Sequence, residues 1–98
     1  MSEIRLKTDD RQKATIILHE ALEKEASRLT YSLQLAKRRL AKFERKYNVT
    51  SEKFINEWSS EDLEDGDMEY VEWAGEFKLA SRLEERLGTL KNIEHETS

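Results

Sequence analysis

The chain lacks cysteine and proline, and only three of its 98 residues are glycine: Gly66, Gly75 and Gly88. Without cysteine it has neither disulfides nor thiolate metal sites. Because proline and glycine most often interrupt helices, their scarcity permits long ones. No apolar run comes near the length of about 18 residues typical of a transmembrane helix. The first ten residues are charged and contain no apolar signal-peptide core. We therefore expect a cytoplasmic protein.

The composition is highly polar for a chain of this size. Charged residues make up 39% of the sequence and hydrophobic residues 37%. These proportions are typical of an elongated helical protein with one buried stripe, and the length predicts a single domain. The net charge of −4 disfavours general attraction to nucleic acid.

A heptad pattern occupies the first half of the chain. Its apolar residues are spaced alternately four and three apart, at Leu22, Ala26, Leu29, Leu33, Ala36, Leu40, Phe43 and Tyr47. This spacing is typical of the a/d seam of a helix that packs lengthwise against another helix. We predict a helix over residues 10–47, capped by Asp9 or Asp10 and ended by Asn48.

A second apolar ladder predicts another helix over residues 67–93, with Asp67 as its cap. The ladder consists of Tyr70, Trp73, Ala74, Phe77, Ala80, Leu83, Leu87, Leu90 and Ile93. Residues 48–66 form the predicted connector, with Thr50 or Ser51 capping a short helix over 51–58 and a turn at Asp65-Gly66. The predicted fold is one all-α domain, an antiparallel, coiled-coil-like hairpin that dimerises into a helical bundle. Residues 1–9 are expected to form a flexible tail and residues 94–98 a frayed end.

Folding the second helix back on the first gives a specific register. With Tyr47 opposite Met68, Leu40 lies opposite Gly75, where the backbones are expected to approach closely. Leu22 then lies opposite Ile93, and earlier residues of the first helix extend beyond the second. Leaving large apolar side chains of this overhang in water forgoes roughly 1.5–3 kcal/mol each. We predict that a protein partner or a second copy binds Ile16, Ile17, Leu18 and Ala21.

The aromatic residues, apart from Tyr31, all lie between residues 43 and 77, around the predicted turn. They are expected to form a small core that fixes the short helix against both long ones. Large aromatic side chains also act as anchors in protein interfaces. The alternative is therefore that some of them, Trp58 and Trp73 in particular, bind a partner.

A basic run near the end of the first helix allows two interpretations. It comprises Lys37, Arg38, Arg39, Lys42, Arg45 and Lys46. In the predicted register it faces the acidic stretch Glu64, Asp65, Asp67, Glu69, Glu72 and Glu76. We favour mutual neutralisation, with Lys37, Arg39 and Lys46 flanking the seam where charges select partner and orientation. Contact with nucleic acid phosphates is the alternative.

No pattern in the sequence predicts catalysis or metal binding. Aligning Gly66 with the glycine of a calcium-binding EF-hand loop places Leu63 at a ligand position, where it supplies no oxygen. His19 does not belong to a zinc-protease motif, and the other histidine, His95, is distant in the sequence. No nucleophile–base pair or glycine-rich phosphate loop is present. We predict no catalytic residues, no cofactor and no metal.

Residues 47–79 resemble a family of short helical antitoxins from type II toxin–antitoxin pairs. The resemblance rests on Tyr47, the segment Ser51-Glu52-Lys53-Phe54, an acidic connector and the segment Tyr70-Val71-Glu72-Trp73-Ala74. The chain departs from the family in having Asn48 where glycine is common and a more acidic connector. The resemblance implies a protein that binds and neutralises a cognate toxin by occlusion. The alternative is a homodimeric coiled-coil adaptor without catalytic function.

Overall fold

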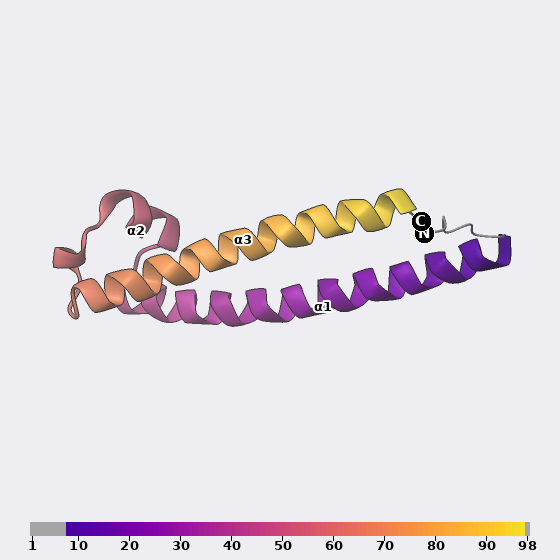
Figure 1. The fold of residues 1–98 in the computed structure, drawn as a ribbon. Helices are drawn as coiled ribbons and strands as arrows, with labels where there is room; N and C mark the ends of the chain where they lie inside the picture. Colours follow the sequence, from indigo (N-terminus) through magenta and orange to yellow (C-terminus); the bar gives the residue numbers. More distant parts are fainter. Residues whose placement is uncertain (1–7, 98) are drawn as a thin grey trace, which may run out of the picture.

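The computed structural model describes residues 8–97 and forms an extended helical hairpin (Figure 1). Its elements are α1 (Thr8–Tyr47), α2 (Ser51–Glu57), the 3-10 helix η1 (Ser60–Asp62) and α3 (Asp67–Thr97). The predicted all-α architecture is confirmed, because α1 packs antiparallel against α3 and a short helix lies in the connector. None of the described helices has an apolar stretch long enough to cross a membrane.

Two ion pairs between the long helices confirm the predicted register. Arg39 of α1 pairs with Glu76 of α3 at 3.3 Å, and Lys46 pairs with Glu69 at 2.7 Å. Both pairs fit the alignment that places Tyr47 opposite Met68. A third pair, between Lys37 and Glu84 at 3.9 Å, lies on another flank of the seam.

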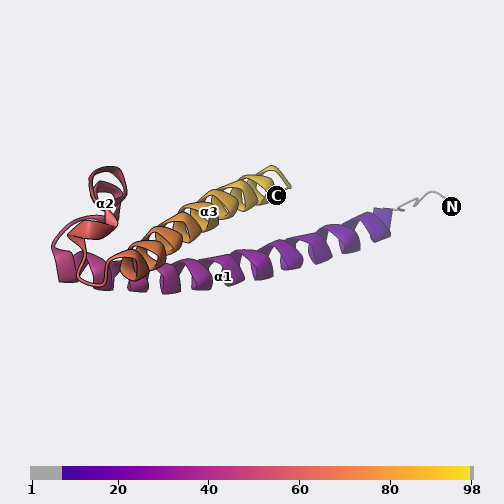
Figure 2. The same ribbon diagram turned by 60° about the vertical axis from the view of Figure 1, so that its left-hand side comes forward.

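The seam is most deeply buried in its middle. Buried side chains from both helices form it, namely Leu29, Leu33, Ala36, Leu40, Ala80, Leu83 and Leu87. Towards the chain termini Leu22 and Leu90 are half-buried and Ile93 is exposed. The ribbons of α1 and α3 also lie farther apart at this end than near the connector (Figures 1 and 2). We refer to residues 14–22 of α1 and 90–96 of α3 as the open end.

The helix ends differ in part from the prediction. Because α1 begins at Thr8, Asp9 and Asp10 lie inside its first turn and not at the position that precedes the helix, where the prediction placed them. α3 begins at Asp67 itself and continues to Thr97, so the prediction of a frayed segment from residue 94 is wrong. Helical hydrogen bonding continues there although the apolar ladder stops at Ile93. Residues 1–7 of the predicted tail and Ser98 lie outside the described residues.

The connector turns at the two positions expected from its sequence. Asn48 has φ 52° and Gly66 has φ 54°, both in the left-handed region that these two residue types tolerate. The Thr50 side chain caps α2 by accepting a hydrogen bond from the Lys53 N–H, as predicted. The helix η1 was not predicted, and a reciprocal capping box between Ser59 and Asp62 holds it.

Gly75 does not mark a close approach of α1 and α3, contrary to the prediction. It is exposed, and a Cβ built on it would meet no atom within 4 Å. The register is right, but Gly75 faces away from the seam. The adjacent position Glu76, through its ion pair with Arg39, is the one directed towards α1.

Candidate protein-interaction surface

The end of the molecule at the connector is held by an aromatic core centred on Trp73. The Trp73 side chain is 0% exposed, and its ring stacks on Phe54 with centroids 3.8 Å apart. Phe43 and Tyr47 of α1 also stack on Trp73, at 5.1 and 5.7 Å. Trp73 therefore joins α1, α2 and α3 in one cluster, as the core interpretation of the aromatic residues predicts.

A chain of hydrogen bonds continues from this core to the start of α2. The Trp73 Nε1–H donates to Ser51 Oγ at 2.9 Å, which satisfies the polar atom of a buried indole. The Ser51 hydroxyl and backbone N–H both donate to the Glu44 carboxylate, at 2.7 and 2.8 Å. A carboxylate at a helix N-terminus also interacts favourably with the helix dipole. Glu44 of α1 therefore fixes the position of α2.

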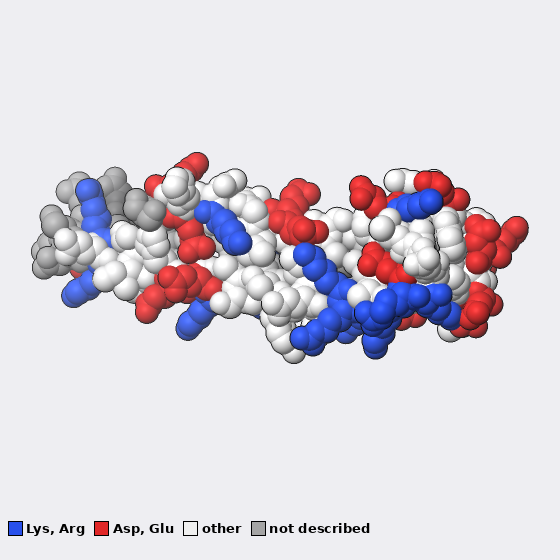
Figure 3. Space-filling view, turned by 180° about the vertical axis from the view of Figure 1, so that it is seen from behind, with Lys and Arg blue, Asp and Glu red and all other residues white. Residues whose placement is uncertain are grey.

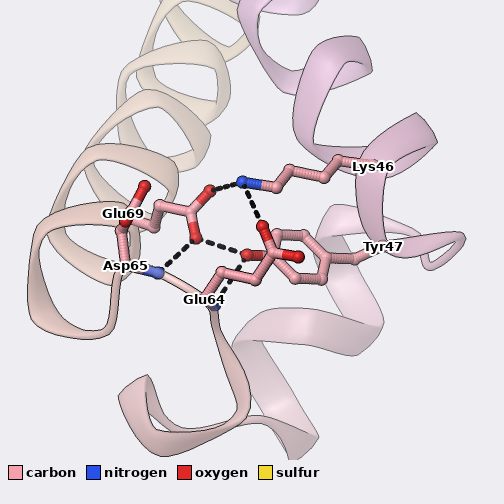
Figure 4. Close-up of polar contacts among 5 residues, drawn as sticks. All are labelled: Lys46, Tyr47, Glu64, Asp65 and Glu69. Carbon is pink, nitrogen blue, oxygen red and sulfur yellow. Dashed lines mark hydrogen bonds and ion pairs between the residues drawn. The ribbon is translucent and has the colours of Figure 1, made fainter.

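A second polar cluster, which we call the Glu69 clasp, ties α3 to the end of α1 and to the connector (Figure 4). The Glu69 carboxylate accepts hydrogen bonds from Lys46 Nζ, the Tyr47 hydroxyl and the Asp65 backbone N–H. The Tyr47 oxygen accepts a further bond from the Glu64 N–H at 2.9 Å. Lys46 also pairs with the Glu64 carboxylate at 3.1 Å. The clasp involves three donors to one carboxylate that is only 7% exposed.

The clasp shifts the pKa values of its members in directions that stabilise the charged pair. Hydrogen bonds from Lys46 and then Tyr47 lower the pKa of Glu69 to about 2. The same bond, together with Glu64, raises the pKa of Lys46 above its ordinary value. Burial, followed by the bond to Glu69, raises the pKa of the Tyr47 hydroxyl. These are the shifts expected when hydrogen bonds favour the ionised carboxylate.

The apolar residues of the predicted partner site are exposed at the open end. Ile16, Ile17 and Leu18 are 59%, 64% and 46% exposed, and Ala21 is also exposed. In the confirmed register Leu18 lies opposite the last residues of α3, so Ile16 and Ile17 lie beyond that helix. An open cavity of about 250 Å³ lies farther along the seam towards the connector, lined by Glu25, Leu29, Glu85, Arg86, Thr89, Leu90 and Ile93.

The predicted site residues do not form one surface. Trp58 and Trp73 lie at the connector, at the opposite end of the hairpin from Ile16 and Ile17. Trp73 is fully buried and offers no surface to a partner, so its position supports the core interpretation. Trp58 is half-buried, with edge contacts to Tyr47 and Phe54 at centroid distances of 5.8 and 6.5 Å.

The basic run is only partly neutralised within the chain. Lys37, Arg39 and Lys46 form ion pairs with α3 or the connector, as predicted for the flanking positions. Among the described residues Arg38 and Arg45 form no ion pair, and neither does Lys42. Figure 3 shows Lys and Arg side chains gathered along α1 near the connector, with acidic groups close by. The pairs of Lys37 and Arg39, whose cations are largely exposed, contribute little to stability and act mainly on register.

Sequence reasoning missed a row of exposed residues along α3, which we call the α3 stripe. It consists of Met68, Val71, Gly75 and Leu79. Steps of three and four residues place these positions on one face of the helix. This spacing is visible in the sequence, but it interleaves with the stronger ladder of Tyr70, Trp73 and Phe77. A second apolar face beside the core ladder is the signal that could have revealed it.

The described part of the chain contains no group of three His, Asp or Glu side chains arranged to hold a metal ion. The features with a potential role in recognition are therefore the apolar surfaces at the open end and on α3. Comparison with known proteins found no matching family model, no matching curated protein and no matching solved structure. The resemblance to antitoxins stays a prediction.

Proposed function

We propose that the protein is a non-catalytic interaction module that binds a protein partner through the open end. The proposal rests on one observation: Ile16, Ile17 and Leu18 are three consecutive exposed apolar residues on α1, at and beyond the point where α3 ends. Burying each of them would favour binding by roughly 1.5–3 kcal/mol before the costs of association.

The geometry of these residues favours a particular mode of binding. Consecutive helical residues project about 100° apart, so Ile16, Ile17 and Leu18 surround much of α1. A flat surface cannot cover all three side chains at once. A groove that receives a helix can, as in other helix-in-groove complexes. We therefore propose that the first turns of α1 insert into a groove of the partner.

A toxin is the specific partner that the sequence resemblance suggests. Inserting α1 into the active-site groove of a toxin would block it by occlusion, without any reaction carried out by this chain. The exposed charges on either side of the apolar residues are balanced, with the acids Asp10, Glu20 and Glu23 and the bases Arg11, Lys13 and Lys24. They favour a groove whose rim carries charges of both signs, because complementary charges speed and orient association. The protein encoded by the adjacent gene is the candidate to test.

The substitution Ile17→Glu is expected to weaken binding of the partner at least about tenfold, because it places a charge in an apolar contact. The side chain is 64% exposed in the free protein, so helix content and thermal stability are expected to stay close to those of the parent chain. Co-expression with the adjacent gene product, affinity measurement by calorimetry and relief of growth arrest would test this result.

Tyr31→Glu provides the matched control, since Tyr31 of α1 is 63% exposed and lies outside both the open end and the α3 stripe. Partner binding by this variant is expected to equal that of the parent chain. Equal binding by Ile17→Glu and the parent would show that the open end is not the site. Failure of the parent chain to form a complex or relieve arrest would remove the toxin as its partner.

A homodimer in which two open ends cover one another is the second candidate. The exposure of Ile93 at 42%, opposite the half-buried Leu22 in the register, favours it because both sides of the seam are incompletely covered there. Two hairpins would then form a bundle that serves as an adaptor. This candidate predicts that Ile17→Glu converts a dimer, measured by light scattering without any partner, into a monomer.

A further inference from the structure

The α3 stripe is an apolar surface on a side of α3 that neither α1 nor α2 covers. Met68 is 80% exposed, Val71 69% and Leu79 42%, and the exposed Gly75 lies between Val71 and Leu79. The first half of the stripe forms a shallow depression lined by Asp67, Met68, Val71 and Glu72. Exposed apolar rows of this kind at helical spacing are typical of surfaces that pack against another helix.

Gly75 indicates how closely that other helix approaches. A glycine inside a helix is less favourable than alanine, because it has more backbone freedom to lose on folding. Nothing in the described chain requires it, because an added Cβ would meet no atom within 4 Å. Glycine does allow a second backbone to come near. Its position in the middle of the α3 stripe therefore marks the point where two helices can cross most closely.

The charges beside the α3 stripe identify the occupant. The first half is bordered by acidic residues and the second half by basic ones, namely Asp67 and Glu72, then Lys78 and Arg82. All four are exposed and, among the described residues, form no ion pair. Two copies of this stripe running antiparallel bring each acidic half against a basic half. A parallel arrangement would bring like charges together.

We infer that the α3 stripe binds a second copy of this chain, antiparallel about a two-fold axis at Gly75. Val71 of one copy then lies opposite Leu79 of the other, and Asp67 lies within one residue of the level of Arg82. Each contact occurs twice, as in any isologous interface. The arrangement leaves both open ends free, at opposite ends of the dimer, so it is independent of the function proposed for Ile16, Ile17 and Leu18.

Sedimentation of the full chain over a wide concentration range tests the inference. The parent chain is expected to show a reversible monomer–dimer equilibrium, and Leu79→Glu is expected to abolish the dimer while circular dichroism shows unchanged helix content. Ile17→Glu is expected to leave the dimer intact. A parent chain that is monomeric throughout, or a dimer lost in Ile17→Glu and kept in Leu79→Glu, would overturn the inference.

Charge exchange tests the antiparallel pairing directly. Asp67→Lys and Arg82→Glu are each expected to weaken self-association at least about tenfold, since each creates two like-charge contacts per dimer. Mixing the two variants restores opposite charges at both contacts, so the mixture is expected to dimerise about as well as the parent. No recovery in the mixture would contradict the pairing of Asp67 with Arg82.

Gly75 and Gly88 are the two exposed glycines of α3, and substituting each in turn tests whether two copies of α3 approach closely at Gly75. Gly75→Ala and Gly88→Ala are each expected to raise the Tm of the monomer by about 4 °C, because alanine favours the helix and neither new Cβ meets an atom. Only Gly75→Ala is expected to weaken the dimer, because Gly88 lies outside the α3 stripe. Equal dimerisation of the two variants would show that the axis does not pass at Gly75.

Discussion

The substitution Trp73→Ala is expected to lower the free energy of unfolding by about 3–5 kcal/mol, the typical loss for a buried tryptophan. Trp73 is 0% exposed and stacks on rings from α1 and α2. Its removal leaves a cavity at the point where the three helices meet. In a domain of this size the Tm is expected to fall by about 15–30 °C, measurable by thermal unfolding followed by circular dichroism.

Two further variants separate the contributions of Trp73. Trp73→Phe keeps a stacked ring but loses the Nε1–H bond to Ser51, and is expected to cost about 1–2 kcal/mol. Trp58→Ala removes a half-buried tryptophan with edge contacts only, so its loss is expected to be well below that of Trp73→Ala. Equal losses for Trp58→Ala and Trp73→Ala would contradict the central position of Trp73.

The substitution Glu69→Gln is expected to cost about 1–3 kcal/mol, because it removes the charge that accepts bonds from Lys46, Tyr47 and Asp65, while Lys46 keeps its pair with Glu64. The amide has nearly the shape of the carboxylate, so the loss reports charge and hydrogen bonding more than packing. Chemical denaturation at neutral pH measures it. Glu85→Gln, at an exposed site on the same helix, is the control and is expected to stay within about 0.5 kcal/mol of the parent.

The Glu69 clasp also makes the free energy of unfolding depend on pH in the acid range. The pKa of Glu69 is about 2 in the folded chain against an ordinary value of 4.5. The folded-state pKa is the lower one, so the contribution of Glu69 is complete above pH 4.5 and is lost as the pH falls towards 2. Unfolding measured over this range is expected to show a weaker acid dependence in Glu69→Gln. Parallel curves for the two chains would show that another carboxylate dominates.

The sequence predicts the hairpin and its register because both depend on patterns that are local to each helix. The heptad ladder from Leu22 to Tyr47 requires a packed seam, and the turn signals at Asn48 and Gly66 fix where the chain reverses. Once the connector length is known, few alignments of α1 and α3 remain. The paired charges Arg39 and Glu76 then agree with the alignment that the ladders select.

The roles of individual side chains at the connector depend on contacts that no local pattern describes. Trp58 and Trp73 have the same chemistry and both lie near the turn, yet the position of α2 covers only Trp73 completely. From the sequence, Glu69 is an acidic residue in the first turn of α3, where it would interact with the helix dipole. Its larger role requires Lys46 and Tyr47, which lie 23 and 22 residues earlier in the chain.

Gly75 shows a different limit of sequence reasoning. A glycine in a predicted seam suggests close packing, and the residue opposite it in the register is the buried Leu40. The helical phase nevertheless turns Gly75 outward, because an alignment along the axis does not specify which face each residue presents. Only the three-dimensional arrangement places Gly75 with Met68, Val71 and Leu79 on an exposed face.

The placement of the aromatic core beside the connector has a consequence for the order of folding. Contacts such as Trp73 with Ser51 and Glu69 with Tyr47 join residues 22 apart, whereas the cavity farther from the connector is lined by residues as distant in sequence as Leu29 and Leu90. Shorter loops close at a lower entropic cost and favour fast formation of the contacts they join. We expect the hairpin to close like a zipper from the connector. The terminal turns of α1 and α3 would then form their contacts last and separate first, which leaves that part of the molecule free to adapt its shape.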